Sequence, residues 1–368
     1  MSNRLLIDPL SLDELRRALS IRDLTDPAQG PHAMQCLLDA IHAALPVPVT
    51  VHRASPIVSI ADNYDRLGYP PDGAARDARY TRYVCDTALL RTQTSAMLPR
   101  VLAGPLPDDG VVSCPGLVYR RDVIDRLHVG EPHQVDLWRV AKRQLTVEDL
   151  YAMIERVVGA ALPGARWRTE PADHPYTTHG LQIDVLADPA SDDWIEIGEC
   201  GLASPALVRP PWTGLAMGLG LDRLVMLRKR IPDIRLLRAT DPRIASQLLD
   251  LEPYREVSTM PAVRRDLSIV VAADTDAEAL GDRVRAALGD RAGLVESIEL
   301  VSRTPCRALP AAALARLGAD PEHDNVLVRL TLRALDRTLT HAECNALRDE
   351  VYAALHAGRV HQWATSRT

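Results

Sequence analysis

The sequence predicts an α+β protein with at least two folded parts. In the first two-thirds of the chain, amphipathic helical stretches alternate irregularly with short strands of alternating polarity, which is typical of helices packed on an antiparallel sheet. From residue 258 onward a second, self-contained series of strands and helices follows. A chain of 368 residues is long enough for two or three domains.

The first part opens with a helical segment at residues 1–47. Ser11 and Glu14 form a capping box for one helix, and the apolar spacing of residues 31–45 predicts a second. A central domain is then expected at residues 48–250. Its predicted strands are 48–54, 180–187, 194–199 and the stretch LVYRRD at 117–122. Its predicted helices are 147–162, capped by Thr146, and the segment that follows the GLG at 218–220.

The C-terminal part, residues 258–368, reads as strand, helix, strand, strand and helix. The predicted elements are 266–272, 276–289, 294–302, 325–335 and 340–357. This βαββα order is the signature of a ferredoxin-like fold, which by itself indicates no function.

Composition excludes several classes of protein. No apolar run approaches the roughly 20 residues of a membrane helix, and the N-terminus lacks the apolar region of a secretory signal, so we expect a cytoplasmic protein without a membrane partner. Six scattered cysteines without CxxC spacing predict reduced thiols and no structural zinc. A net charge of −6 argues against nucleic-acid binding through overall charge alone.

Two arginines are the first candidates for chemistry. The chain has no Walker A loop, no GxGxxG after a strand and no nucleophile elbow. Arg120 and Arg223 come from separate predicted elements, and a guanidinium both pairs with phosphate oxygens and stacks on a flat ring. Together they could grip a nucleoside triphosphate. The alternative is that both are ordinary surface arginines, since only two of the 43 basic residues are lysines.

Several motifs resemble those of one enzyme family. YRRDVIDRLHVGEPHQVD (119–136) resembles the second motif of class II aminoacyl-tRNA synthetases in its phenylalanyl-tRNA synthetase form, and GLAMGLGLDRLVML (214–227) resembles the third. LLRTQTSAM (89–97) resembles the segment that lines the amino-acid pocket. The resemblance extends over about residues 55–356 and includes MPAVRRDLSIVV, which resembles the opening of the anticodon-binding domain.

The order of these motifs resembles that of the single-chain, mitochondrial-type enzyme. It implies a class II catalytic core on an antiparallel sheet, followed directly by a ferredoxin-like anticodon-binding domain. The implied reaction is ATP-dependent formation of an aminoacyl-adenylate and transfer of the amino acid to tRNA, with tRNA-Phe as the expected partner. The implied small molecules are ATP, Mg²⁺ and the amino acid, and the implied assembly is a monomer or a homodimer.

The resemblance also implies roles for individual residues. Arg120 and Arg223 would be catalytic and bind ATP, and Glu196 would hold Mg²⁺. The further ATP-binding residues would be Asp122, His128, Pro132 and Asp222. The residues implied to bind the amino acid are Ser95, Gln134, Asp136, His174, Tyr176, Glu199 and Ala216.

The chain departs from the family where the substrate ring would stack. His174 and Tyr176, in HPYT, replace two phenylalanines, and Pro132 replaces a third. One interpretation is a pocket rebuilt for a more polar amino acid. The other is a chain-wide exclusion, because the sequence contains no phenylalanine at all. Exclusion of phenylalanine from the chain does not explain Glu199, Gln93 and Leu98, because the residues that they replace are not phenylalanine. Glu199 replaces a glycine.

The absence of phenylalanine suggests a synthetase expressed during phenylalanine starvation or in the presence of a toxic analogue. Drift with codon bias is the alternative. Two other functions also stay open: an enzyme that passes its adenylate to an acceptor other than tRNA, and a non-catalytic paralogue. The intact Arg120, Arg223 and Glu196 argue against the paralogue.

Overall fold

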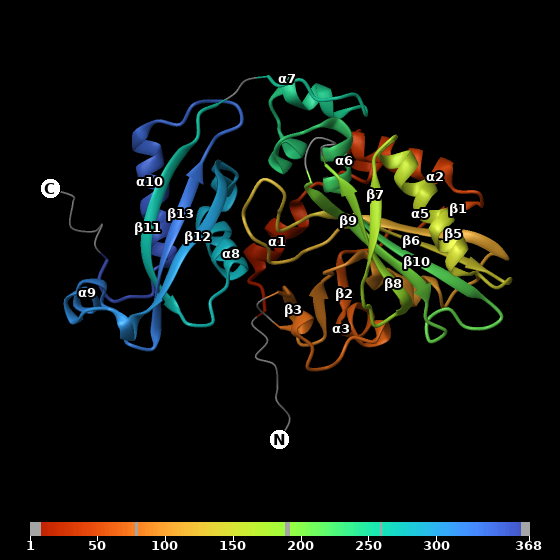
Figure 1. Cartoon of the computed structure of the whole chain (residues 1–368), viewed down its shortest axis with the longest axis horizontal. Coiled ribbons are helices and arrows are strands. Elements are labelled where there is room, and N and C mark those ends of the chain that lie inside the picture. Colours follow the sequence, from red (N-terminus) through yellow and green to blue (C-terminus); the bar gives the residue numbers. More distant parts are fainter. Residues whose placement is uncertain (1–8, 78–79, 188–191, 258–259, 362–368) are drawn as a thin grey trace. The chain divides into compact units, whose positions relative to one another are not determined.

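The computed structural model describes residues 9–77, 80–187, 192–257 and 260–361, which fall into two compact units. The first unit comprises residues 1–120, 131–232 and 245–255, and the second comprises 121–130, 233–244 and 256–368. Figure 1 traces the chain through both. The second unit thus includes a loop, 121–130, that the sequence assigns to the central domain.

A seven-stranded sheet forms the centre of the first unit, with the strand order β1-β5-β6-β10-β9-β8-β7 (Figure 1). Neighbouring strands are antiparallel, except that β1 runs parallel to β5. The strands are β1 (Val49–Val51), β5 (Asp109–Leu117), β6 (His133–Ala141), β7 (Trp167–Pro171), β8 (Thr177–Leu186), β9 (Trp194–Ala203) and β10 (Thr213–Gly220).

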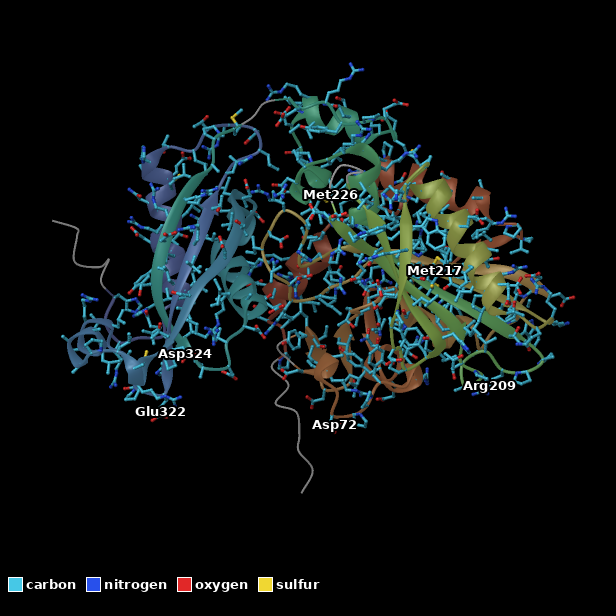
Figure 2. The ribbon with its side chains drawn as sticks, in the orientation of Figure 1. Asp72, Arg209, Met217, Met226, Glu322 and Asp324 are labelled. Atoms are coloured by element: carbon cyan, nitrogen blue, oxygen red, sulfur yellow. The ribbon has the colours of Figure 1, made fainter. Side chains whose placement is uncertain are left out.

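Helices α2 (Ala33–Ala44), α5 (Val147–Ala161) and α6 (Leu221–Lys229) accompany this sheet, and α5 and α6 both contact β9. The predicted cap of α5 is confirmed, because Thr146 and Asp149 form a capping box. Its buried residues recur every three or four positions, as an amphipathic helix on a sheet requires. In Figure 2, Met217 of β10 and Met226 of α6 lie in the interior of the unit, where both are buried.

The N-terminal part of the first unit adds α1 (Leu12–Ser20), whose predicted capping box between Ser11 and Glu14 is confirmed. A small antiparallel sheet follows, with the order β2-β4-β3. The remaining elements of this part are β2 (Ile57–Ser59), β3 (Tyr83–Cys85), β4 (Ala88–Leu90), α3 (Ile60–Asn63), α4 (Leu98–Val101) and a 3₁₀ turn at Thr94–Met97. The sequence does not reveal these strands of three residues, because so short a run carries almost no periodicity.

One local prediction in the first unit was wrong. Arg120 does not lie in a strand, since β5 ends at Leu117, where its ladder with His133 of β6 stops. Beyond that point the N–H of Tyr119 donates to the carbonyl of Arg91, so the chain turns away from the sheet. The predicted helix after the GLG at 218–220 is confirmed: the GLG ends β10, and α6 begins at Leu221.

The second unit contains a three-stranded antiparallel sheet with the order β11-β13-β12. Its elements are β11 (Val263–Ala272), α8 (Ala277–Leu288), β12 (Val295–Pro305), α9 (Ala311–Leu317), β13 (His323–Leu332) and α10 (His341–Leu355). The predicted strand and helix series is present, with α9 as an addition that the sequence did not indicate. Whether the fold is ferredoxin-like stays a prediction.

The loop 121–130 belongs to the second unit because its backbone and side chains are bonded there. Ile124 is buried in the core of this unit, and its carbonyl accepts a hydrogen bond from the N–H of Ile298. Arg285 donates to the carbonyls of Asp122 and Val123 at 2.6 and 2.7 Å. A short helix, α7 (Pro242–Ala245), lies near the end of the segment 233–244. Across the described residues, every helix is too short or too polar to cross a membrane.

Candidate active site

Three neighbouring strands of the large sheet, β6, β10 and β9, leave an open surface over Gly218, between the carboxylates of Asp136 and Glu199. This surface is called the floor of the site. Gly218 of β10 is the direct partner of Asp136 on β6 and of Glu199 on β9, so the three residues face the same side of the sheet. A Cβ atom at Gly218 would meet nothing nearer than Oδ1 of Asp136, at 4.0 Å. The space above Gly218 is therefore free for a ligand that both acids flank.

Asp136 is buried, and its carboxylate is held by three side chains. Thr94 Oγ1 donates at 2.7 Å, Ser95 Oγ at 2.9 Å and Trp138 Nε1 at 3.0 Å. Burial raises the pKa of Asp136, whereas these hydrogen bonds oppose the rise by favouring the charged form. The predicted contact residues Ser95 and Asp136 are thus in direct contact.

Aromatic rings surround this floor. The ring of Tyr176 lies 5.9 Å from that of Trp138, 5.8 Å from His174 and 6.3 Å from Tyr69, measured between centroids. Burial raises the pKa of Tyr69 to about 12, and the charges of Asp136 and Glu199 add to that rise. Both tyrosine hydroxyls are therefore neutral at physiological pH, because burial also raises the pKa of Tyr176. They are aromatic groups with a polar edge near the two acids.

His174 and Glu199 form a close pair at the edge of this aromatic group. Their nearest atoms, Nε2 and Oε2, are 2.6 Å apart. The His174 side chain is 9% exposed and that of Glu199 is 45% exposed. Although close, Glu199 lies outside hydrogen-bonding geometry for Nε2, which is buried without a hydrogen-bond partner in the described structure. The two residues that depart most from the resembled motif therefore meet.

Two further predicted residues complete the same face of the sheet. Ala216 pairs with Trp138 and Gly201, one step along β10 from Gly218. In the other direction, Gln134 pairs with Gly220, where α6 is about to begin. The floor thus leads from the aromatic rings toward the start of α6.

Arg120, Arg223 and Glu196 share one electrostatic neighbourhood. Arg223 Nη1 donates to the carbonyl of Glu196 at 2.6 Å. Partial desolvation raises the pKa of the Glu196 carboxyl and the charge of Glu199 adds to the rise, whereas the charges of Arg223 and Arg120 lower it. Both guanidinium groups therefore act on one acid, although one follows β5 and the other lies on α6.

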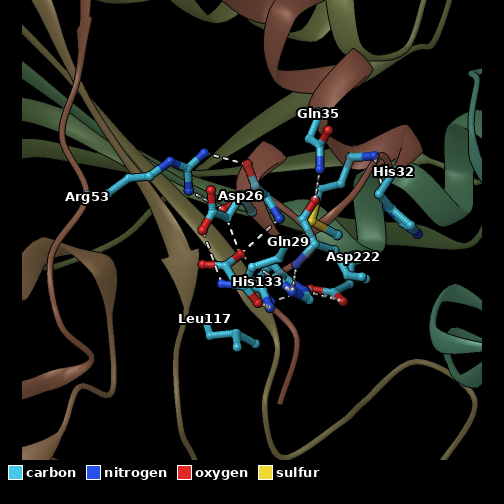
Figure 3. Close-up of polar contacts among 12 residues, drawn as sticks. Asp26, Gln29, His32, Gln35, Arg53, Leu117, His133 and Asp222 are labelled. Atoms are coloured by element: carbon cyan, nitrogen blue, oxygen red, sulfur yellow. Dashed lines mark hydrogen bonds and ion pairs between the residues drawn. The ribbon is translucent and has the colours of Figure 1, made fainter. Parts of the chain in front are cut away.

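Asp222 is buried at the start of α6, where it bonds to His133 (Figure 3). The Asp222 carboxylate accepts from the His133 N–H and from its ring Nδ1, 3.0 Å away. On the other side of the ring, Nε2 accepts from the N–H of Leu24 at 3.0 Å. Asp222 thus connects α6 to the start of β6 in this structure, and His133 is a residue that sequence reasoning missed.

The remaining predicted ATP residues have local partners. Asp122 and His128 lie in the loop of the second unit, where Asp122 Oδ1 accepts from the N–H of Val123 and His128 Nδ1 lies 2.8 Å from Asp125. The carbonyl of Pro132 accepts from the N–H of Val118, beside the start of β6. None of these contacts joins them to Asp136 or Glu199.

Metal binding would need oxygen atoms from a ligand. Within the described ranges, no group of three histidine, cysteine or acidic side chains is placed to hold a metal ion. Mg²⁺ commonly takes only one or two carboxylates together with substrate phosphates and water. The exposed Glu196 fits that requirement, whereas Asp184, its register partner on β8, is buried and bonded to Gln182 and Arg168.

Sequence reasoning also missed Thr94, Trp138 and Tyr69. The sequence itself contains a signal for two of them, Trp138 and Thr94. Trp138 lies two residues after Asp136, so strand alternation places both on one face. Thr94 directly precedes Ser95. Tyr69 comes from a separate segment, and only the tertiary structure brings it to Tyr176.

Residues 30–248 match the family described as "tRNA synthetases class II core domain (F)". The phenylalanine–tRNA ligase alpha subunit of Nostoc punctiforme is 34% identical over 191 residues, which cover 50% of this chain and 56% of that protein. The corresponding subunit of Chlorobaculum tepidum is 31% identical over 211 residues, with 51% and 60% covered. The chain therefore spans little more than half the length of these curated relatives.

Among solved structures, pyrrolysyl-tRNA synthetase from Desulfitobacterium hafniense superposes with a TM-score of 0.44 and 17% identity, over 62% of this chain and 78% of that one.

Proposed function

The chain belongs to the tRNA synthetase class II core family, and we propose that it activates phenylalanine or a close aromatic analogue with ATP and transfers it to a tRNA. One observation carries this proposal. The buried, hydrogen-bonded Asp136 of β6 and the group of Glu196 (β9), Arg223 (α6) and Arg120 (the loop after β5) belong to one unit built on the seven-stranded sheet. An acid for an ammonium group and arginines for phosphates are what the two substrates need.

The amino acid is proposed to bind over Gly218. Its α-ammonium group donates to Asp136, which Ser95 and Thr94 orient. An ionised carboxylate held by fixed donors recognises a cation strongly in a site of low dielectric. The ring of the substrate packs against Tyr176 and its aromatic neighbours, at the distances that aromatic pairs prefer.

The first chemical step joins the two substrates. A carboxylate oxygen of the amino acid attacks the α-phosphorus of ATP; a new P–O bond forms, the bond to the β-phosphate oxygen breaks, and pyrophosphate leaves. Arg120 stabilises the charge that develops on the α-phosphate, and Arg223 stacks on adenine. Glu196 would hold Mg²⁺, which supplies neutralising charge to the phosphates. Alignment and charge stabilisation carry the step, with no covalent enzyme intermediate.

In the second step a terminal ribose hydroxyl of tRNA attacks the acyl carbon, its proton is released, and AMP leaves. The second unit is proposed to bind the anticodon region. Arg329 lies on β13 and Arg333 directly follows its last residue, but each already has an acidic partner, Asp266 at 2.9 Å and Glu296 at 2.6 Å. Phosphate contact by these side chains would have to compete with those ion pairs.

ATP–pyrophosphate exchange with a panel of amino acids, followed by charging of tRNA, tests the proposal. We expect exchange with an aromatic amino acid and aminoacylation of tRNA-Phe. Exchange without charging of any tRNA would point to a different acceptor. Failure of every amino acid to support exchange, in a protein whose circular dichroism shows a folded chain, would contradict the proposal.

A further inference from the structure

Glu199 places a carboxylate at the aromatic end of the proposed amino-acid site. It flanks Gly218 on the side opposite Asp136, and its side chain is 45% exposed, so a bound amino acid would reach it. Since Asp136 already serves the α-ammonium group in the proposed function, Glu199 is left for the substrate's side chain. The following inference rests on that function.

His174 supplies a second, incompletely satisfied polar atom at the same place. Nδ1 has Thr177 Oγ1 at 3.3 Å, but Nε2 is buried without a hydrogen-bond partner in the described structure, even though Glu199 lies beside it. Buried polar atoms in native proteins are nearly always hydrogen-bonded. Nε2 is in contact with Glu199 but not aligned for a hydrogen bond, so a ligand atom on the open floor could complete its bonding.

The surroundings restrict that ligand atom to one carried by a flat ring. The ring of Tyr176 has three aromatic neighbours, His174 at 5.8 Å, Trp138 at 5.9 Å and Tyr69 at 6.3 Å between centroids. Gly220 extends the floor, since a Cβ there would meet nothing nearer than the carbonyl of Ile197 at 3.9 Å. The floor and its aromatic wall suit a planar side chain.

A ring hydroxyl can hydrogen-bond to both members of the His174–Glu199 pair. Its O–H donates to the Glu199 carboxylate, and its oxygen accepts from Nε2–H of His174. An unsubstituted phenyl ring would instead desolvate the Glu199 carboxylate and the His174 imidazole without offering either a hydrogen bond. We propose that Glu199 and His174 make this enzyme select an aromatic amino acid with a ring hydroxyl over phenylalanine.

The test is pyrophosphate exchange with phenylalanine and its ortho-, meta- and para-hydroxy derivatives. Because a site built for a hydroxyl discriminates strongly against the analogue that lacks it, we expect at least one hydroxylated substrate to exceed phenylalanine in kcat/KM by about 10-fold or more. Glu199→Ala is expected to reduce that ratio at least about 10-fold, as is His174→Phe. Glu170→Ala, which removes an exposed acid from the edge strand β7, is the control and should leave the ratio unchanged.

The outcomes separate the two proposals. Exchange that is fastest with phenylalanine, at a ratio that Glu199→Ala and His174→Phe do not alter, would overturn the selection of a hydroxyl and leave the synthetase function standing. Absence of exchange with every amino acid would overturn the function and, with it, this inference. Thermal unfolding of each variant shows whether an altered ratio belongs to a folded protein.

Discussion

The carboxylate of Asp222 at the start of α6 accepts hydrogen bonds from both the backbone N–H and the ring Nδ1–H of His133 at the start of β6. The ring's other nitrogen accepts from Leu24, in the N-terminal segment. One imidazole therefore connects three separate parts of the first unit, and Figure 3 shows its contact with Asp222. Gln134 and Arg223 project from two of these parts, β6 and α6.

Replacement of His133 by alanine is expected to lower the free energy of unfolding by about 2–4 kcal/mol, because it removes the ring's hydrogen bonds to the buried Asp222 carboxylate and to the buried Leu24 N–H. Urea denaturation followed by tryptophan fluorescence measures this. The tryptophans of the described chain all belong to the first unit: Trp138, Trp167, Trp194 and Trp212. His52→Ala, at a half-buried position, is the matched control; equal losses in both variants would refute the assigned role.

A pH profile tests the role of Asp136. Burial raises its pKa, so the carboxyl becomes protonated at a higher pH than an ordinary aspartic acid, whose pKa is about 3.9. Only the ionised form attracts an ammonium group, so kcat/KM for the amino acid should fall as pH drops, with an apparent pKa above that of an ordinary carboxyl. Asp136→Asn should abolish this fall in kcat/KM at low pH and lower kcat/KM at least about 30-fold.

Asp173→Asn, an exposed acid close to His174 in sequence, is the control for that experiment and should retain the wild-type profile. An acid limb that persists in Asp136→Asn would assign the titration to another group, and Asp136 would lose its proposed role.

Arg120→Ala is expected to lower the rate of pyrophosphate exchange by about 10²–10³-fold, the usual loss when one stabilising donor is removed from a transition state. The fold should be unaffected, because Arg120 is exposed in the loop after β5. Arg16→Ala, which removes an equally exposed guanidinium from α1, should leave exchange unaltered. Near-normal exchange in Arg120→Ala would remove this arginine from the site.

The chain's two lysines offer a matched pair for stability. Lys229 is fully buried, and its ammonium group donates to the carbonyls of Asp250 and Glu252. Lys229→Met keeps the apolar stem but leaves those acceptors without their donor, which should cost about 2–4 kcal/mol of unfolding free energy. Lys142→Met removes an exposed ion pair with Asp108 and should cost less than about 1 kcal/mol. Equal costs in urea denaturation would contradict the assigned role of Lys229.

The helices with strong local signals were predictable. Thr146 and Ser11 cap their helices as expected, because a capping box depends only on residues three positions apart. The strand assigned to LVYRRD failed because β5 ends where its partner β6 begins, and no residue near Arg120 records that boundary. The helix α9 was not predicted because its seven residues make fewer than two turns, too few for an amphipathic pattern to stand out.

The candidate site was only partly predictable. Motif resemblance singled out Ser95, Asp136 and Glu199 before any geometry was known, but not what they contact. Trp138 donates to Asp136 because the two residues share a face of β6. Asp122 and His128, grouped with the ATP site by resemblance, have their bonds in the loop that packs into the second unit, since the side chain of Ile124 is buried there.

What the sequence by itself determined is local in origin: the capped helices, the alternation of the long strands, and the identity of the residues that carry charge in each motif. Tertiary structure alone decided that Glu199 and Asp136 stand on either side of Gly218, and that Glu199 meets His174. Those relationships depend on strand register and on which strands are neighbours. Strand register and strand order are both set by the packing of the whole sheet and its helices. No single stretch of the sequence contains that information.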